Sequence, residues 1–166
     1  MALPDDLLTQ ARHLVSLDRR RPKQANLRRA VSAAYYALFH LLASESARRI
    51  SPVVPASLVL HLRRAFDHAT MRHVCSAMLD SRSRLRSVFA LTPSVDLILV
   101  ADSFHRLQDA RHEADYDVST ALDRGEATLS VQSAEGAFAA WKRVRNTDEA
   151  NIFLLALLMK KDWPRS

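Results

Sequence analysis

The sequence predicts an all-α protein: an antiparallel bundle of about five to seven helices, in one domain that spans residues 1–166. Three observations favour this fold class. The chain holds only two glycines, too few for a sheet protein with many tight turns. Alanine, leucine and arginine are abundant, and all three favour helices. Apolar residues also recur at the three- and four-residue spacing of amphipathic helices.

Four helices are expected in the first half of the chain. The opening helix is expected over residues 5–18, because carboxylates suit its start and Pro22 marks a break beyond its end. A long second helix is expected over residues 23–49, and the prolines of segment 51–55 end it. Two shorter helices follow, at residues 57–68 and 71–86.

Three further helices are expected in the second half. Thr92-Pro93-Ser94 is a typical helix start, with proline at or beside the cap, and the helix that follows runs toward Tyr116. The sequence Asp-Arg-Gly at residues 123–125 indicates a turn. Asn146 followed by Glu149 resembles a capping box. The last two helices are expected over residues 128–145 and 149–161.

The chain is basic, with a formal net charge of +6 and an isoelectric point near 10.1. Most of its positive charge comes from arginine, which binds phosphate oxygens in a bidentate geometry. A basic field also attracts nucleic acid. The same arginine content is typical of proteins from genomes rich in G and C, so charge by itself identifies no partner.

A single cysteine, Cys75, cannot form an internal disulfide, which favours the reducing cytoplasm. The first residues lack the apolar stretch of a secretory signal. The densest apolar run, residues 152–159, is too short to span a bilayer. We therefore expect no membrane association. We also expect no organic cofactor, because two glycines leave no Gly-rich phosphate loop.

A polar stripe on the second helix comprises Arg29, Ser32, Tyr36 and His40. At 100° per residue these four fall within an arc of about 80°, while the rest of the helix is apolar or alanine. Such a helix is buried by neighbours on several sides, and each unpaired polar group there costs about 1–3 kcal/mol. The stripe forms either a core network, with Arg29 paired to a carboxylate, or a pocket for a ligand.

A second polar stripe lies on the helix before Tyr116, also within about 80° if the helix continues through residue 112. Its members are Asp102, His105, Asp109, His112 and Tyr116. Three of them, His105, Asp109 and His112, have side chains that suit a divalent metal. A solvated polar face is the commoner explanation, and we predict no metal site.

Arg111 and Asp115 lie on the apolar side of the same helix, in line with Val100 and Phe104. They are one turn apart, so an arginine–carboxylate pair can form. An unpaired charge at this position would be costly. We therefore expect a structural ion pair, either within one subunit or across a dimer.

Two segments resemble a known family. They are RRAVSAAYYALFHLL at residues 28–42 and RHEADYD at residues 111–117. In this order they resemble a group of HEPN proteins, small α-helical domains found in prokaryotic nucleotidyltransferase pairs and RNA-cleaving toxins. The similarity covers roughly residues 5–160. It implies a helical bundle that dimerises through the helices bearing the two segments, so that the polar stripes meet at a shared cleft.

Catalytic HEPN members cleave RNA without a metal. They carry an arginine followed after four to six residues by a histidine, often with a tyrosine two positions beyond. The resemblance therefore implies Arg106 and His112 as a catalytic pair, with Tyr116 orienting the phosphate. The chain departs from the pattern at Ala114, where many toxin-type members carry the catalytic histidine.

Three functions stay open at this point. The first is a metal-independent endoribonuclease of a toxin–antitoxin or defence system, with its cleft at a homodimer interface. The second is a non-catalytic module that binds RNA or a nucleotide, or that assembles with a nucleotidyltransferase or an antitoxin; Ala114 favours this reading. The third is a structural dimer in which the interface uses both stripes. Kinship of fold is only an analogy for function.

Overall fold

The computed structural model describes residues 2–18, 20–50, 52, 55–117 and 119–159. Eight α-helices and no strand are present among these residues, which confirms the predicted all-α fold class. The helices are α1 (Leu3–Ser16), α2 (Gln24–Ile50), α3 (Ala56–Ala65), α4 (His68–Leu79), α5 (Arg84–Val88), α6 (Val95–Tyr116), α7 (Arg124–Val144) and α8 (Asp148–Met159).

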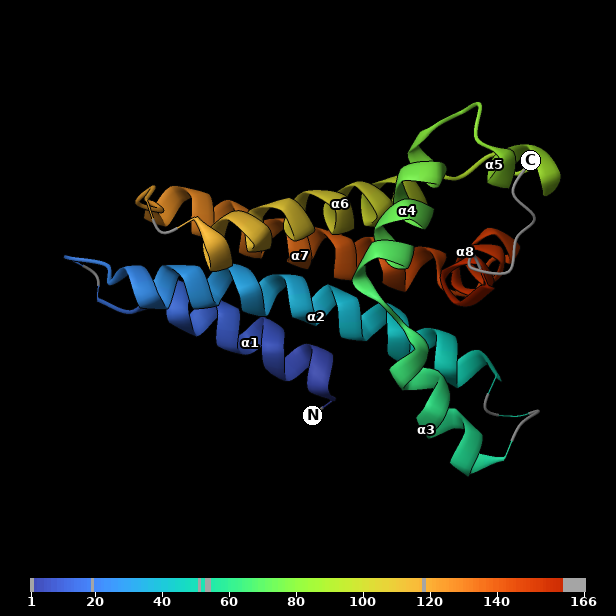
Figure 1. Ribbon diagram of the computed structural model, residues 1–166, viewed down its shortest axis with the longest axis horizontal. Coiled ribbons are helices and arrows are strands. Elements are labelled where there is room, and N and C mark those ends of the chain that lie inside the picture. Colours follow the sequence, from blue (N-terminus) through green and yellow to red (C-terminus); the bar gives the residue numbers. More distant parts are fainter. Residues whose placement is uncertain (1, 19, 51, 53–54, 118, 160–166) are drawn as a thin grey trace.

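Four long helices form the body of the molecule. α1 and α2 make one antiparallel hairpin, α6 and α7 make another, and the two hairpins lie along the same long axis (Figure 1). α2 is central, because α1, α3, α6, α7 and α8 all contact it. These contacts explain why α2 is apolar nearly all round: the side chains of Leu27, Val31, Leu38 and Leu42 are at most 1% exposed.

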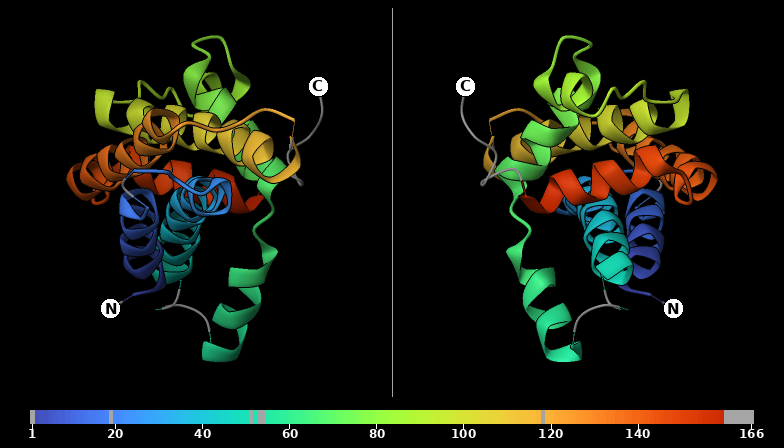
Figure 2. Two further views of the ribbon diagram at one scale, coloured as in Figure 1. Left: turned by 90° about the vertical axis from the view of Figure 1, so that its left-hand side faces the viewer. Right: turned by 90° about the vertical axis from the view of Figure 1, so that its right-hand side faces the viewer.

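The other four helices gather at one end of the two hairpins. α8 crosses the long axis, and α3 projects away from the body before the chain returns through α4 and α5 (Figure 2). Large aromatic side chains fill the core beneath them. Trp141 and Phe153 lie with ring centroids 6.5 Å apart, and both are at most 1% exposed.

The boundary expected between the third and fourth helices is shifted. His68 begins α4 instead of ending α3, because Asp67 caps α4. The Asp67 carboxylate accepts hydrogen bonds from the backbone N–H of Thr70 at 2.8 Å and from its hydroxyl at 2.6 Å. This cap places the His68 ring at the start of a helix, where it faces α2.

The helix expected over residues 71–86 is in fact two helices. Asp80 ends α4, and its carboxylate accepts a hydrogen bond from the backbone N–H of Arg82. Ser83 then caps α5 by accepting from the backbone N–H of Arg86 at 3.3 Å. This break accounts for a helix beyond the seven that the sequence pattern indicated.

The prediction of a turn at residues 123–125 is wrong, because these residues begin α7. Asp123 is the N-cap of α7, and it forms a complete capping box with Glu126. Gly125 therefore lies in the first turn of α7, and the helix starts at Arg124 instead of residue 128.

The start of α8 also differs from the expected one. Thr147, not Asn146, caps the helix, because its hydroxyl accepts from the backbone N–H of Ala150 at 3.3 Å. Glu149 instead accepts from the backbone N–H of Ser94 at 2.7 Å, which ties α8 to the start of α6. The expected end of this helix at residue 161, and residues 51, 53 and 54 of the predicted loop, lie outside the described residues.

Across the part of the chain that the structure describes, no helix is both long enough and apolar enough to cross a membrane.

Candidate functional site on the α2–α6 face

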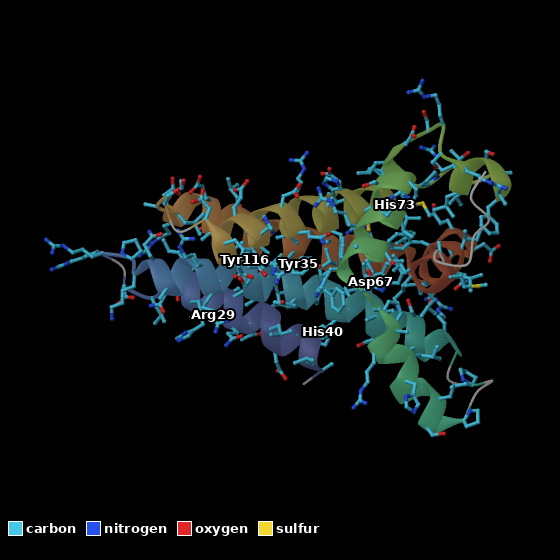
Figure 3. The ribbon with its side chains drawn as sticks, in the orientation of Figure 1. Arg29, Tyr35, His40, Asp67, His73 and Tyr116 are labelled. Carbon is cyan, nitrogen blue, oxygen red and sulfur yellow. The ribbon has the colours of Figure 1, made fainter. Side chains whose placement is uncertain are left out.

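The two polar stripes predicted from the sequence lie on adjoining helices. We call their shared surface the α2–α6 face: Arg29, Ser32, Tyr36 and His40 on α2, with Arg111, His112, Asp115 and Tyr116 on α6. Figure 3 shows Tyr35 between the two helices, Arg29 and His40 along α2, and Tyr116 near the C-terminal end of α6.

The centre of this face is a hydrogen-bonded network across the two helices. The Ser32 hydroxyl donates to Asp115 Oδ1 at 2.6 Å, and Arg111 Nε donates to Asp115 Oδ2 at 2.8 Å. The Arg111 side chain is only 18% exposed and that of Asp115 is 29% exposed. The ion pair predicted from the sequence is therefore present, and it lies within one chain.

Aromatic rings cover the Arg111 guanidinium. Its Cζ lies 5.4 Å from the centroid of Tyr36 and 5.7 Å from that of Tyr35, within the range of cation–π attraction. Burial works against the positive charge, but Tyr36 and the hydrogen bond and charge of Asp115 outweigh it and raise the pKa of Arg111. Arg111 thus stays charged while it holds α6 against α2.

Behind the network, the Tyr35 hydroxyl and Nδ1 of His68 lie 2.6 Å apart. Burial raises the pKa of the Tyr35 phenol well above its usual value. Burial, and then the charge of Arg111, lower the pKa of His68. A neutral imidazole is therefore the favoured form of His68, with Nδ1 as the acceptor for the Tyr35 hydroxyl. The ring also packs on Phe39, at 4.5 Å between centroids.

Arg28 is a further member of this region that the sequence analysis missed. Its guanidinium donates to the carbonyl oxygens of Ala114 at 2.8 Å, Asp117 at 2.7 Å and Thr120 at 2.6 Å. The last carbonyls of a helix have no partner within it, so Arg28 satisfies the C-terminal end of α6 and fixes the chain that follows. Its partners are backbone carbonyl oxygens, which every residue type has, so no sequence pattern identifies them.

The α2 side of the face is more open than the network. Arg29 is exposed, whereas Tyr36 and His40 are partly buried. Burial lowers the pKa of His40. Arg29 lacks the carboxylate that a core network would give it: no ion pair to its guanidinium occurs among the described residues. The α2 stripe is therefore divided, with Ser32 inside the network and Arg29 outside it.

A pocket of about 380 Å³ adjoins the stripe between α1 and α2. Leu7, Gln10 and Leu14 of α1 line one wall, and the other wall belongs to α2, with Arg29, Tyr36 and neighbouring small residues. Ser32 connects the two features, because it is one of the residues that line the pocket and its hydroxyl donates to Asp115.

The residues that the family resemblance assigns to catalysis are separated on α6. His112 and Tyr116 lie together, with ring centroids 4.9 Å apart, and both are exposed. Arg106 instead forms an ion pair with Asp102 at 2.8 Å, and its side chain is 75% exposed. Six residues of helix turn Arg106 and His112 about 120° away from each other, so one chain does not aim both side chains at one point.

His105 and Asp109 belong to another contact, between α6 and α4. Arg72 of α4 donates to Asp109 Oδ1 at 2.6 Å, and His105 Nδ1 lies 3.4 Å from Asp109 Oδ2. The arginine already neutralises the carboxylate that a metal would need. No group of three or more His, Cys, Asp or Glu side chains suited to a metal occurs in the described part of the chain.

The positive charge of the chain is unevenly distributed. Residues 19–29 carry six positive charges and no carboxylate, and residues 44–91 carry eight arginines and three carboxylates, a net charge of +5. The second stretch contains α3, α4 and α5, which gather at one end of the two hairpins (Figure 1). The α2–α6 face therefore adjoins positively charged stretches of the chain.

Comparisons of the chain with models of protein families, with curated proteins and with solved structures give no match.

Proposed function

We propose that this protein binds single-stranded RNA on the α2–α6 face, as a HEPN-like component of a toxin–antitoxin or defence system in the cytoplasm. The observation that carries the proposal is the network Ser32–Asp115–Arg111, which joins the two segments of the family resemblance on one surface. The partly buried polar groups of the face bond to one another in this network. Beside it lies a rim of aromatic and basic side chains, formed by Tyr116, His112 and Arg29.

The rim has the composition that single-stranded RNA requires. Tyr116 is 66% exposed and its ring packs beside that of His112, so both are available for base stacking. Each stacked base contributes about 1–3 kcal/mol to binding. Arg29 supplies a positive charge for the phosphate backbone of the RNA. The net charge of +5 between residues 44 and 91 attracts the strand at longer range.

The test measures the affinity of a fluorescent 20-nucleotide single-stranded RNA at several salt concentrations. We expect Tyr116→Ala with His112→Ala to weaken binding about tenfold or more, since two stacking surfaces are lost. Leu129→Ala is the matched control, because Leu129 is also 66% exposed but lies on α7. An RNA affinity that the double variant leaves at the wild-type value would exclude this face.

RNA cleavage without a metal is a second candidate, favoured by the exposed His112–Tyr116 pair on α6. The imidazole would take the proton from a ribose 2′-hydroxyl, whose oxygen attacks phosphorus, and an arginine would stabilise the negative charge on the non-bridging oxygens. The bond from phosphorus to the 5′-oxygen then breaks and that oxygen takes up a proton, which leaves a 2′,3′-cyclic phosphate. Because Arg106 of one chain points elsewhere, this reaction requires the arginine of a second copy, in the homodimer that the resemblance implies.

Cleavage is tested with labelled total tRNA and mRNA in EDTA. Loss of cleavage in both His112→Ala and Arg106→Ala would establish the pair. Recovery of cleavage on mixing the two inactive variants would show that the site is shared between subunits. If RNA binds and stays intact, the remaining hypothesis is the non-catalytic module, which acts alone or with a nucleotidyltransferase or antitoxin partner.

A further inference from the structure

The pocket between α1 and α2 contains chemistry that the network does not use. Among the described residues that line it, Arg29 is the only charged one and none is a carboxylate. Gln10 and Tyr36 add neutral polar groups, and neither makes a side-chain hydrogen bond to another described residue. Leu7 and Leu14 form an apolar wall opposite. The pocket therefore offers one positive charge, two neutral donors and an apolar surface.

These groups specify a ligand with a single negative charge and a flat or apolar body. One guanidinium matches the charge of a phosphodiester, and it binds two phosphate oxygens in a bidentate geometry. A terminal phosphate with two charges would leave one of them without a partner. The volume of about 380 Å³ falls within the range of about 300–1,000 Å³ for small-ligand sites.

The position of the pocket connects it to the RNA-binding face. Ser32 lines the pocket and bonds to Asp115, and Tyr36 lines the pocket while its ring covers Arg111. A strand that stacks on the rim of α6 can therefore continue across α2 and turn one base into this space. The base would pack between Leu14 and Tyr36, with its phosphodiester at Arg29.

We propose that the α1–α2 pocket is a subsite for one unstacked nucleotide of single-stranded RNA, recognised through its phosphodiester by Arg29 and through its base by the pocket walls. The proposal rests on the RNA-binding function above and adds the place where a base of the strand is recognised. A pocket that receives a base gives the protein sequence preference, since Gln10 can pair with a base edge.

The probe is ApA, a dinucleoside monophosphate with one phosphodiester, carrying a 2′-O-methyl group that prevents its cleavage. Binding is followed by NMR through the side-chain amide signals of Gln10. We expect a saturable shift of those signals with ApA. Arg29→Gln should weaken ApA binding about tenfold or more, because a charge-assisted bidentate contact is lost.

Arg82→Gln is the matched control. Arg82 is exposed on the loop between α4 and α5, so its substitution removes the same charge far from the pocket. We expect it to change ApA affinity less than about twofold. Inorganic phosphate should give no saturable shift, because it lacks the base. Equal shifts with phosphate and ApA, or equal losses in the two arginine variants, would overturn the proposal.

The 20-nucleotide RNA, measured in parallel, separates this proposal from the RNA-binding function. RNA binding that depends on Tyr116 and His112, without any response to ApA, would reject the pocket and retain the function. Binding of ApA at Gln10 without binding of the longer RNA would retain the pocket as a ligand site and reject the RNA-binding function. If Arg29→Gln loses affinity for both ApA and the 20-nucleotide RNA, the result supports both the pocket subsite and the RNA-binding function.

Discussion

Two histidine–tyrosine pairs adjoin the α2–α6 face, and they differ in burial and in bonding. Tyr35 of α2 and His68 of α4 are 33 residues apart in sequence and share a hydrogen bond of 2.6 Å. His112 and Tyr116 lie one turn apart on α6, with their rings in contact at 4.9 Å and both exposed. The first pair shares its hydrogen bond inside the protein, whereas the second presents its rings to solvent, where the proposed RNA would stack.

If the proposed function holds, one pair serves stability and the other serves recognition. The Tyr35–His68 pair joins α4 to α2, and the Arg111 guanidinium lies over the Tyr35 ring. The exposed pair contributes little to the core, so its side chains are free to serve binding. Substitutions at the two pairs should therefore affect different properties, stability in one and RNA affinity in the other.

The largest difference is expected between Tyr35→Ala and Tyr116→Ala. Tyr35 is 0% exposed, so its truncation should cost about 3–5 kcal/mol of unfolding free energy through the cavity it leaves. Tyr116 is 66% exposed, and its truncation should change stability by less than about 0.5 kcal/mol. Chemical denaturation of both variants measures the difference. Similar losses of stability would mean that the two pairs are not distinct in the way we describe.

A smaller difference is expected between two arginines on α6. Arg111→Met leaves the Asp115 carboxylate without its ion pair in a partly buried site and should cost about 2 kcal/mol. Arg106→Met removes an exposed pair with Asp102 and should cost less than about 0.5 kcal/mol. Thermal unfolding at matched pH compares them. An Arg106 variant as unstable as the Arg111 variant would contradict the assignment of the network to α2 and α6.

Removal of the hydroxyl alone sharpens the comparison further. Tyr35→Phe keeps the ring and deletes the partner of His68 Nδ1, so we expect a loss of about 1–2 kcal/mol. His68→Phe with Tyr35→Phe replaces both partners by apolar groups and should recover part of that loss. A double-mutant cycle by urea denaturation gives the coupling between the two side chains. A coupling near zero would show that the hydrogen bond is not formed in solution.

The smallest effect is a dependence of stability on pH. Burial, then the charge of Arg111, depress the pKa of His68, while Asp67 raises it and His40 lowers it. The unfolded chain therefore binds the proton more readily, near its ordinary pKa of about 6.5. Stability is complete above that pH and is lost as the pH falls through the lower, folded value. His68→Asn should flatten this loss in urea titrations between about pH 7.5 and pH 5.

The sequence predicted the parts of the site that follow from spacing along one helix. Arg111 and Asp115 are four residues apart, so helical geometry alone brings them together. The apolar side of α2 is also as expected, because Leu27, Val31 and Leu38 recur at helical intervals. Both results depend only on local periodicity, which a single sequence contains.

The parts that the sequence could not predict join segments far apart in the chain. The pairing of Tyr35 with His68 depends on where α4 starts, which the Asp67 cap fixes. The contacts of Arg28 end on backbone carbonyls. The division of the α2 stripe into a bonded Ser32 and an open Arg29 depends on the position of α6. Each requires tertiary packing, which overrides local pattern.

The most direct test of the central claim locates RNA on the protein by photo-crosslinking. Single-stranded RNA with photoreactive uridines is crosslinked to the wild-type protein, and the attached peptides are identified by mass spectrometry. We predict crosslinks on α2 around Tyr36 and on α6 around His112 and Tyr116. Crosslinks confined to the arginine-rich residues 56–91, or absent from α2 and α6, would contradict the account.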